Sequence, residues 1–281
     1  TDAFAHETKE QVIEEIKTSV GHVDLVIYSL ASGVRTDPDT GAKYYSVLKP
    51  VDREYTGSSL DSKMGKLVEK TLPAATPEEI EATKKVMGGE DWSLWIKALK
   101  KAKVLSSRMK TIAYSYIGPS VTYPLYRDGT IGRAKEHLEA TAFALTKELS
   151  GIDGAAYVSV NKALVTRASA VIPSVPLYLA ILYRVMKDKG LHEGTIEQMY
   201  RLYSDRLYRP DGEIPVDSEG RIRLDDWEMR DDVQEQVTTI WNKIGQNSLE
   251  QLADLEGFND DFFQMHGFGF PEIDYEEDVA I

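Results

Sequence analysis

The chain of 281 residues is 42% hydrophobic and 28% charged, so it can bury the core of one large domain or two ordinary ones. It contains no cysteine, which excludes disulfides, thiolate catalysis and cysteine-ligated metals. Its net charge of −13 argues against binding to nucleic acid or anionic membranes. The sequence shows no signal peptide and no apolar run of about 18 residues, so we expect a cytoplasmic protein with no membrane span.

The first half of the chain alternates between helical and strand patterns. Residues 8–20 carry apolar side chains at helical spacing behind Thr8, a candidate N-cap. Further helices are expected over 76–87, with Thr76 as the cap, and over 90–102 and 131–149. Short apolar runs typical of strands covered on both faces occupy the ranges 24–30, 110–118 and 155–161. This alternation predicts a parallel α/β sheet with right-handed crossovers.

The region 33–75 is rich in Pro, Asp, Gly, Ser and Thr, and we expect it to be an irregular insertion. Beyond Pro173 the pattern predicts helices over 173–190, 193–208 and 231–245, and a hairpin-like segment over 212–228. The acidic end, 272–281, is expected to be a solvated tail. We therefore predict a single domain over residues 1–281, with the insertion 33–75 and a helical region 173–245.

The stretch TYPLYRDGTIGRAKEHLEATA places Tyr126 nine positions before Lys135. In one continuous helix nine residues turn through about 900°, so the two side chains would point in opposite directions. Gly129 and Gly132 weaken a helix here. We therefore expect the helix to start near Thr130 and Tyr126 to lie in the loop before it, folded over the face of the lysine. The spacing alone leaves open a second interpretation, in which Tyr126 packs on its neighbours and Lys135 is a solvated surface charge.

We expect no bound metal. The five histidines show neither i,i+4 nor His-x-His spacing and no acidic partner pattern. Ordinary helix and loop positions account for His6, His22, His137, His192 and His266.

Several blocks of the chain resemble those of one enzyme family. They are DLVIYSLASGVRTDPDTG, KVMGGEDW, YSYIGPSVTYPLYRDGTIGRAKEHLEATA, VSVNKALVTRASAVIP and RLYRPDGEIPVD. Together they are similar to the trans-2-enoyl thioester reductases with a Tyr-x8-Lys motif, the monomeric NADH-dependent enoyl-CoA and enoyl-acyl-carrier-protein reductases. The resemblance extends from Asp2 to about Tyr275. It implies a Rossmann-type, short-chain dehydrogenase-like fold, in which a doubly wound parallel sheet carries a helical substrate-binding lid at 173–245.

The resemblance also implies the reaction and its partners. An enzyme of this family uses NADH to reduce the 2,3 double bond of a trans-2-enoyl thioester to the acyl thioester in fatty acid synthesis. The substrate would be carried by CoA or by acyl carrier protein. The dense basic stretch KALKKAKVLSSRMK from Lys97 is either a landing site for an acidic carrier protein or a solvated helix face.

Individual residues receive roles from the resemblance. Tyr126 would be the proton donor, Lys135 would support it and bind the nicotinamide ribose, and Tyr116 would contact the thioester carbonyl. The expected cofactor contacts besides Lys135 are Asp2, Ala3, Leu30, Ala31, Leu164, Val165 and Thr166. These residue types suit the chemistry, because a neutral tyrosine hydroxyl can strengthen its hydrogen bond as negative charge develops on the carbonyl oxygen, and a nearby ammonium favours that charge.

No G-x-G-x-x-G motif occurs in the chain. The resemblance places the first strand and the glycine-rich turn that holds the cofactor pyrophosphate before Thr1, in a part of roughly 100 residues. We expect this part to be present as a separate N-terminal fragment of the same protein, bound non-covalently. Without it the strand at 24–30 would be an exposed apolar edge.

Two other functions stay open at this point. A Tyr/Lys ketoreductase or sugar epimerase would need a catalytic serine upstream of the tyrosine, and the order Ser115–Tyr116 disfavours it. A truncated, non-catalytic module that binds an acyl group or a nucleotide is the second alternative. It predicts that NADH does not bind.

Overall fold

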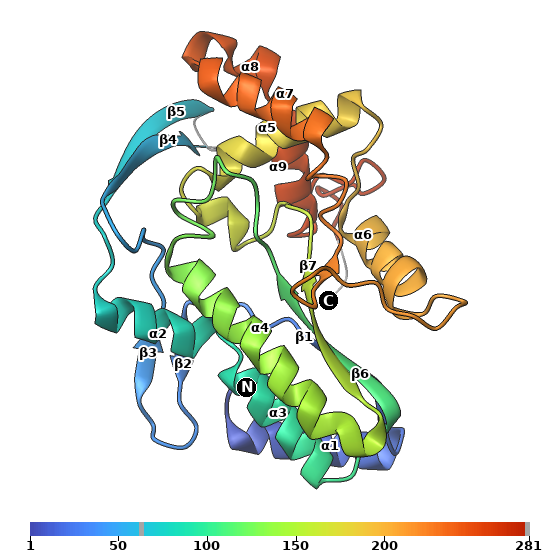
Figure 1. Ribbon diagram of the computed structural model, residues 1–281. Coiled ribbons are helices and arrows are strands. Elements are labelled where there is room, and N and C mark those ends of the chain that lie inside the picture. Colours follow the sequence, from blue (N-terminus) through green and yellow to red (C-terminus); the bar gives the residue numbers. More distant parts are fainter. Residues whose placement is uncertain (62–64, 279–281) are drawn as a thin grey trace. The chain divides into compact units, whose positions relative to one another are not determined.

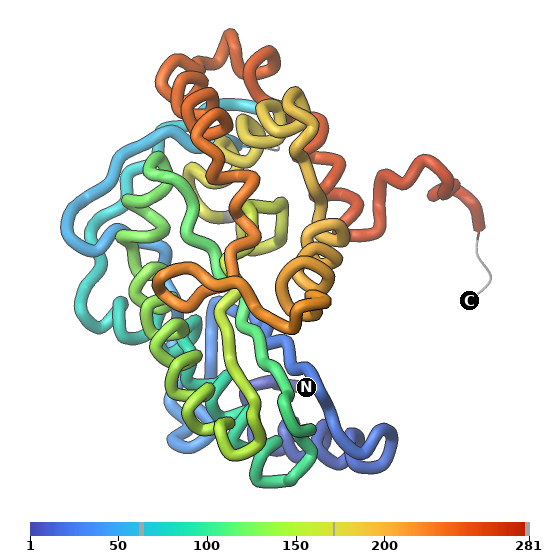
Figure 2. Tube along the Cα trace, turned by 45° about the vertical axis from the view of Figure 1, so that its right-hand side comes forward, coloured from blue at the N-terminus to red at the C-terminus, as the bar shows by residue number. Residues whose placement is uncertain are grey.

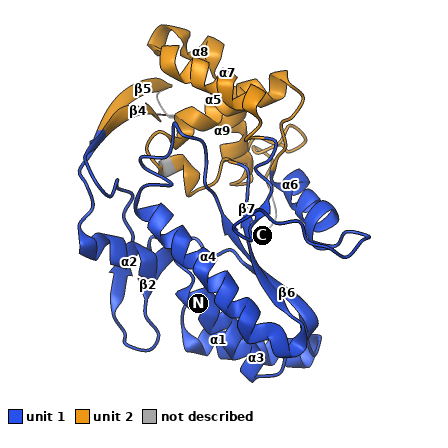
Figure 3. Cartoon of the chain, viewed as in Figure 1, with its two compact units in different colours: residues 1–55, 71–162, 195–227 blue, residues 56–70, 163–194, 228–281 orange. Residues whose placement is uncertain are grey.

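The computed structural model describes residues 1–61 and 65–278, and these form two compact units (Figure 1, Figure 3). Unit 1 comprises residues 1–55, 71–162 and 195–227. Unit 2 comprises the described parts of 56–70, 163–194 and 228–281. Neither unit is continuous in sequence, so no composition shift along the chain marks the division.

Unit 1 is built on a parallel sheet. Its described strands are β1 (Val23–Tyr28), β6 (Leu105–Ser115), β7 (Ala155–Val160) and β8 (Ile222–Arg223), in the order β1-β6-β7-β8. Each strand runs parallel to its neighbour. Tyr28 pairs with Ala113, and Ser115 pairs with Val160, so β1, β6 and β7 end at the same edge of the sheet. In open α/β sheets this carboxyl edge is where ligands bind.

Helices cover both faces of the sheet (Figure 1). Those on one face are α1 (His6–Ser19), α3 (Glu90–Lys101) and α4 (Thr130–Leu149); those on the other are α6 (Thr195–Leu202) and the π-helix η3 (Tyr203–Leu207). The first group packs on the sheet through side chains such as Trp92 and Leu145, and the second through Leu202 and Leu207. The predicted doubly wound parallel α/β fold is therefore confirmed.

The sequence of α4 explains how this helix is oriented. Its buried positions follow the three- and four-residue spacing of one helix face, and they include Ile131, Ala134, Leu138, Ala142, Leu145 and Leu149. Lys135 comes one position after a buried alanine, so it lies at the border of this face and is only partly exposed. A lysine at such a border can reach back to the strand beneath the helix.

The segment 33–75 is more regular than we expected. Its first part forms an antiparallel hairpin of β2 (Val34–Thr36) and β3 (Lys43–Tyr45) in unit 1. A second strand pair, β4 (Tyr55–Asp61) with β5 (Lys66–Leu72), belongs mostly to unit 2. The helix α2 (Pro77–Met87) then starts at the predicted cap, because the Thr76 hydroxyl accepts a hydrogen bond from the Glu79 amide and the Glu79 carboxylate accepts one from the Thr76 amide.

Unit 2 is mainly helical. Its central helix α5 (Val175–Asp188) is buried along most of its length and packs against α7 (Asp231–Lys243) and α9 (Leu255–Gln264), with the short α8 (Leu249–Leu252) between these two in sequence. Short 3-10 helices occupy Ser150–Ile152 in unit 1, and Ser169–Val171 and Gln246–Ser248 in unit 2. Figure 2 shows a tail after α9, and its residues 272–278 are exposed, as predicted. None of the helices in the described part of the chain has both the length and the apolar character that a membrane crossing requires.

Two expectations about element ends were wrong. α1 begins at His6, and the Thr8 hydroxyl donates to the Asp2 carbonyl at 2.6 Å instead of capping the helix. The segment 212–228 does contain a tight turn, in which the Asp217 amide donates to the Arg221 carbonyl, but the strand after it pairs with β7. The turn carries the chain back to the sheet, where β8 adds a parallel strand.

Candidate active site

The two tyrosines and the lysine singled out by the sequence lie together at the carboxyl end of β6. Tyr116 directly follows Ser115, the last residue of the strand. Its ring meets that of Tyr126 edge-on, with 4.9 Å between the ring centroids and 82° between the planes. Lys135, in the second turn of α4, donates from Nζ to the carbonyl of Tyr114 at 3.2 Å. The structure therefore brings the three side chains to one edge of one sheet.

Glycines allow the loop and the helix to approach each other closely. The Gly132 amide donates to the Tyr126 carbonyl at 3.0 Å, and a Cβ atom on Gly132 would lie 1.7 Å from the Arg127 carbonyl oxygen. Gly118 has a φ of +75°, and a Cβ atom there would lie 2.8 Å from the Tyr116 hydroxyl. The helix starts after this loop, as the sequence predicted, and the Tyr126 carbonyl also accepts a hydrogen bond from the Gly129 amide, just before the helix, at 3.3 Å.

Burial shifts the pKa values of Tyr126 and Lys135 in opposite directions. Both side chains keep some contact with solvent, but protein atoms surround them closely. Burial raises the pKa of Tyr126, so its hydroxyl is a neutral donor at pH 7. Burial lowers the pKa of Lys135 to about 8, against the opposing charge of Glu139, which itself pairs with Arg221 at 3.4 Å. At pH 7 most of the lysine is still charged, so a hydroxyl donor and an ammonium are available at one place.

The two neighbouring tyrosines, Tyr114 and Tyr123, have contacts of their own. The Tyr114 hydroxyl donates to Met199 Sδ at 2.9 Å, and the Tyr123 ring lies 4.6 Å from the Arg127 guanidinium. Ser115 is buried, and no described residue hydrogen-bonds to its Oγ. The residue that contacts the proposed donor Tyr126 is Tyr116, which follows Ser115 in the sequence. A ketoreductase would need a serine hydroxyl in that place, so the contact argues against the ketoreductase alternative.

A buried ion pair holds the first of the expected cofactor segments, Asp2 and Ala3. The Ala3 carbonyl accepts hydrogen bonds from Trp95 Nε1 at 3.2 Å and from Lys9 Nζ at 3.4 Å. Lys9 is 1% exposed and pairs with the equally buried carboxylate of Asp91 at 2.8 Å. The backbone at Ala3 is therefore fixed to both α1 and α3.

The same aspartate connects this segment to the end of β1. Asp91 accepts a hydrogen bond at 3.2 Å from the hydroxyl of Tyr28, the last residue of β1. Leu30 and Ala31 are exposed in the loop that follows. Sequence reasoning missed Lys9 and Asp91, because in the sequence each is an ordinary charge near the start of a helix, and only the fold buries them together.

The remaining expected cofactor residues, Leu164, Val165 and Thr166, lie in unit 2, in the loop after β7. The Val165 amide donates to the hydroxyl of Tyr183 at 3.2 Å, and the Thr166 amide donates to Ser169 Oγ at 2.8 Å. The loop therefore has its own anchorage within unit 2. Tyr183 was not foreseen, because in the sequence it is one apolar-face residue of a helix among many.

Most of the basic stretch 97–110 lies far from Tyr116. It spans the end of α3 and the first half of β6, whereas Tyr116 follows the other end of the same strand. β6 has 11 residues, which at about 3.3 Å per residue extend on the order of 30 Å. The stretch is therefore a poor landing site for a carrier that must deliver an acyl group to Tyr116, and a solvated helix face describes it better.

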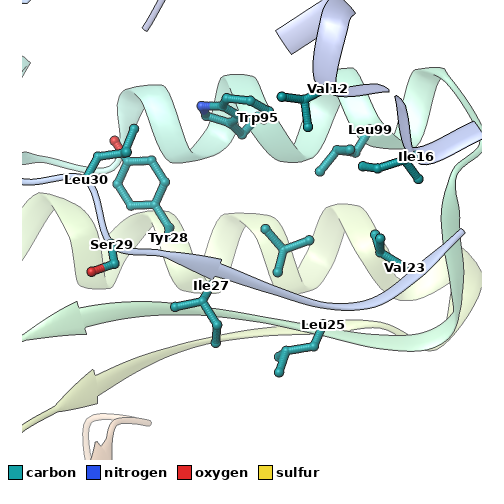
Figure 4. A pocket seen from close by; sticks show the side chains of 11 residues that line it. Val12, Ile16, Val23, Leu25, Ile27, Tyr28, Ser29, Leu30, Trp95 and Leu99 are labelled. Atoms are coloured by element: carbon teal, nitrogen blue, oxygen red, sulfur yellow. The ribbon is translucent and has the colours of Figure 1, made fainter. Parts of the chain in front are cut away.

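An apolar pocket of about 410 Å³ lies beside β1 (Figure 4). Its lining includes Val12 and Ile16 of α1, Trp95 and Leu99 of α3, and the strand itself. Among the described strands, β1 pairs only with β6. The run 24–30 therefore has one open apolar edge, as the sequence led us to expect. The pocket offers almost no polar groups, so it has little to contribute to proton or hydride transfer.

Comparison with known proteins gives a consistent result. Residues 1–208 match the family model described as the trans-2-enoyl-CoA reductase catalytic region. The chain is 53% identical to the NADH-dependent enoyl-acyl-carrier-protein reductase of Flavobacterium johnsoniae, over 99% of this chain and 70% of that protein. It is 55% identical to the NADH-dependent trans-2-enoyl-CoA reductase of Clostridium perfringens, over 100% of this chain and 71% of that protein. The crystal structure of Treponema denticola trans-2-enoyl-CoA reductase in complex with NAD is similar, with a TM-score of 0.95 and 56% identity over 99% of this chain and 69% of that one.

Residues 216–279 match a model described as the enoyl reductase FAD binding domain, but they do not suit a flavin dinucleotide. The segment contains 18 acidic and 4 basic residues, so its charge opposes a pyrophosphate. Three of the basic side chains, Arg221, Arg223 and Arg230, already form ion pairs with aspartates. No chemical step is therefore assigned to a flavin.

Proposed function

Since the chain belongs to the trans-2-enoyl-CoA reductase family, we propose that it uses NADH to reduce the 2,3 double bond of trans-2-enoyl thioesters, giving acyl thioesters for fatty acid synthesis. The thioester is carried by CoA or by acyl carrier protein, the two carriers in the names of its relatives. The proposed enzyme acts as a monomer, as the family resemblance implies.

Three side chains act on the thioester in this proposal. Bound NADH supplies the hydride that is added to the β-carbon. Tyr126 donates a hydrogen bond and then a proton as negative charge develops on the substrate, and one such donor is typically worth about 3 to 4 kcal/mol in the transition state. Tyr116 donates a second hydrogen bond to the thioester carbonyl. The ammonium of Lys135 favours the developing charge and also binds the nicotinamide ribose.

The observation that carries the proposal is the contact between Tyr116 and Tyr126 at the carboxyl edge of the sheet, next to the strand residue that Lys135 contacts. The 4.9 Å edge-to-face contact brings two phenol rings together, and the hydrogen bond from Lys135 Nζ to the Tyr114 carbonyl fixes the ammonium at the same strand end. An enolate oxygen needs such hydroxyl donors, whereas a carbonyl reductase would place a serine hydroxyl beside the tyrosine.

The cofactor contacts of the proposal are Asp2, Ala3, Leu30, Ala31, Lys135, Leu164, Val165 and Thr166. The residues present suit a nicotinamide dinucleotide in two respects. Leu30 and Ala31 follow the carboxyl end of a parallel strand and are exposed, as a ligand-binding loop requires. The Ala3 backbone is held by buried partners, so it is already ordered before a ligand arrives.

A substrate comparison tests the proposal. Purified protein is mixed with NADH and a crotonyl thioester, an acetoacetyl thioester or a saturated butyryl thioester, and the loss of NADH absorbance is followed. We expect oxidation of NADH with the crotonyl thioester only. Oxidation with the acetoacetyl thioester alone would support a ketoreductase. No oxidation with any thioester, together with no change in NADH fluorescence on titration, would support the non-catalytic module.

A further inference from the structure

Two tyrosines of α5, the central helix of unit 2, form hydrogen-bonded pairs with carboxylates from other elements. The Tyr178 hydroxyl donates to Glu228 Oε1 at 2.6 Å, and the Tyr183 hydroxyl donates to Asp261 Oδ2 at 2.6 Å. Tyr178, Tyr183 and Glu228 are each 0% exposed. Hydrogen bonds between a hydroxyl and a carboxylate at this distance are among the strong ones in proteins, so both tyrosine protons have a fixed direction.

Each pair also holds one amide of the loop that follows β7. Glu228 Oε2 accepts a hydrogen bond from the Ala163 amide at 2.7 Å. The Tyr183 hydroxyl accepts one from the Val165 amide at 3.2 Å. Because the Tyr183 proton is given to Asp261, a lone pair of its oxygen is left facing the loop. The two pairs therefore hold alternate amides, two residues apart.

The backbone amide of Leu164 lies between these two amides in sequence. The Leu164 N–H donates to none of the residues that the structure describes, and the side chain of Leu164 is only partly buried. The next amide, that of Thr166, is taken by Ser169 Oγ, whose hydroxyl in turn donates to the Leu164 carbonyl at 2.8 Å. Within the run 163–166, Leu164 is thus the residue whose amide is still available as a donor. Its backbone is held through the hydrogen bonds of the preceding and following residues, Ala163 and Val165.

We propose that the two tyrosine–carboxylate pairs, Tyr178–Glu228 and Tyr183–Asp261, are positioning residues that fix the Ala163–Thr166 backbone so that the Leu164 amide is free to donate to the cofactor. This role rests on the proposed function. A carboxamide on the bound nicotinamide is the chemical group that one free amide donor suits, because it presents a carbonyl oxygen. The pairs do not touch the reacting atoms, so they act on cofactor binding and leave the chemical step intact.

The central variant is Tyr183→Phe, which keeps the ring and removes the oxygen that joins Val165 to Asp261. We expect the dissociation constant and the KM for NADH to rise about tenfold, the effect of one lost hydrogen bond, while kcat stays within about threefold of the wild-type value. In the absence of cofactor, amide hydrogen exchange over residues 163–166 should become faster. Asp261→Asn keeps an oxygen that can accept the tyrosine proton and should restore most of the affinity that Asp261→Ala loses.

Lys187→Met is the matched control. Lys187 lies on α5, one turn after Tyr183, and its Nζ pairs with Asp254 at the N-cap of α9 at 2.6 Å and lies 5.7 Å from the centroid of the Tyr183 ring. The variant therefore removes a contact between α5 and α9 and a cation–π contact with Tyr183, but it keeps the Tyr183 hydroxyl and its two hydrogen bonds. It does not touch the loop, and its NADH affinity and its loop exchange should match the wild type. Thermal unfolding of each variant shows whether the fold is retained.

The outcomes separate the two proposals. A Tyr183→Phe variant that matches the wild type in NADH affinity and loop exchange would overturn this inference and leave the proposed function standing. Equal weakening by Lys187→Met would also overturn it, because the effect would then come from loosening α5 against α9. A wild-type protein that neither binds NADH nor reduces a crotonyl thioester would overturn the proposed function and with it this role.

Discussion

Tyr126 and Lys135 respond to burial in opposite ways, and the difference decides what each can do. Burial disfavours the charged form of both groups, so the tyrosine keeps its proton more firmly and the lysine holds its proton less firmly. The tyrosine is therefore a donor over the whole physiological range. The lysine is charged only because its lowered pKa, about 8, still lies above neutral pH.

The first prediction concerns Tyr126. Tyr126→Phe should lower kcat for a crotonyl thioester at least about 100-fold, because it deletes the donor and keeps the ring that packs on Tyr116. Tyr123→Phe is the control, since that ring is stacked near Arg127 and should tolerate the change. Steady-state kinetics of the two variants at saturating NADH provide the measurement. A Tyr126→Phe enzyme with near wild-type kcat would show that the donor lies elsewhere.

The second prediction concerns pH and Lys135. The value of kcat/KM should fall as pH rises through about 8, because the free enzyme loses the ammonium there. Loss of stability does not explain such a fall. The pKa of Lys135 is lower in the folded state than in the unfolded chain. The free energy of unfolding should therefore increase as pH rises from about 8 toward the ordinary pKa of a lysine. Lys135→Arg keeps a cation at all these pH values, and the descending limb should disappear from its pH profile.

At the scale of the elements, local patterns predicted helices better than strands. The cap at Thr76 and the helix α4 depend on neighbours within one or two turns, and both were predicted from the sequence. β6 was expected over 110–118 but runs over Leu105–Ser115. Its first half contains the polar residues Ser106, Ser107 and Arg108 and no apolar run. The pairing with β1 is also irregular there, because it jumps from Val23–Leu105 to Leu25–Lys110.

The third prediction follows from this irregularity. Arg108, inside β6, has a φ of 59°, a left-handed conformation that costs a residue with a side chain about 1 to 2 kcal/mol. Arg108→Gly should therefore raise the melting temperature by roughly 1–3 °C. Arg108→Ala removes the same charge but keeps the Cβ atom, so it should bring no gain. Differential scanning calorimetry distinguishes them, and an equal gain in both variants would mean that charge, not backbone conformation, is responsible.

At the scale of the whole molecule, the sequence could not show what the fold buries. The motif around Tyr126 and Lys135 is local and could be found by spacing. Lys9 and Asp91 are 82 residues apart, and Tyr183 and Asp261 are 78 apart, so no window along the chain shows them as pairs. The two units are interleaved in sequence for the same reason: long-range packing defines them, and composition does not.

The fourth prediction uses the net charge of −13. An acidic carrier protein should be repelled by this chain, so the KM for a carrier-borne crotonyl thioester should fall as ionic strength rises past about 0.1 M, where screening acts within about 10 Å. The KM for the CoA thioester should change less. Lys97→Glu with Lys101→Glu lowers the net charge by four, as does Lys70→Glu with Lys243→Glu at two other exposed positions, so both variants should raise the KM for the carrier-borne substrate equally. A larger rise in the Lys97 and Lys101 variant would identify the basic stretch as the landing site after all.

The open edge of β1 has a calorimetric consequence. Val12, Ile16, Trp95 and their neighbours already expose apolar surface in the folded state, so unfolding uncovers less new apolar surface than it does in a protein whose sheet is covered at both edges. The heat-capacity increment of unfolding should therefore lie below the usual value of roughly 12–15 cal/mol/K per residue. Any partner that covers this pocket, whatever its identity, should raise the heat-capacity increment and the melting temperature together.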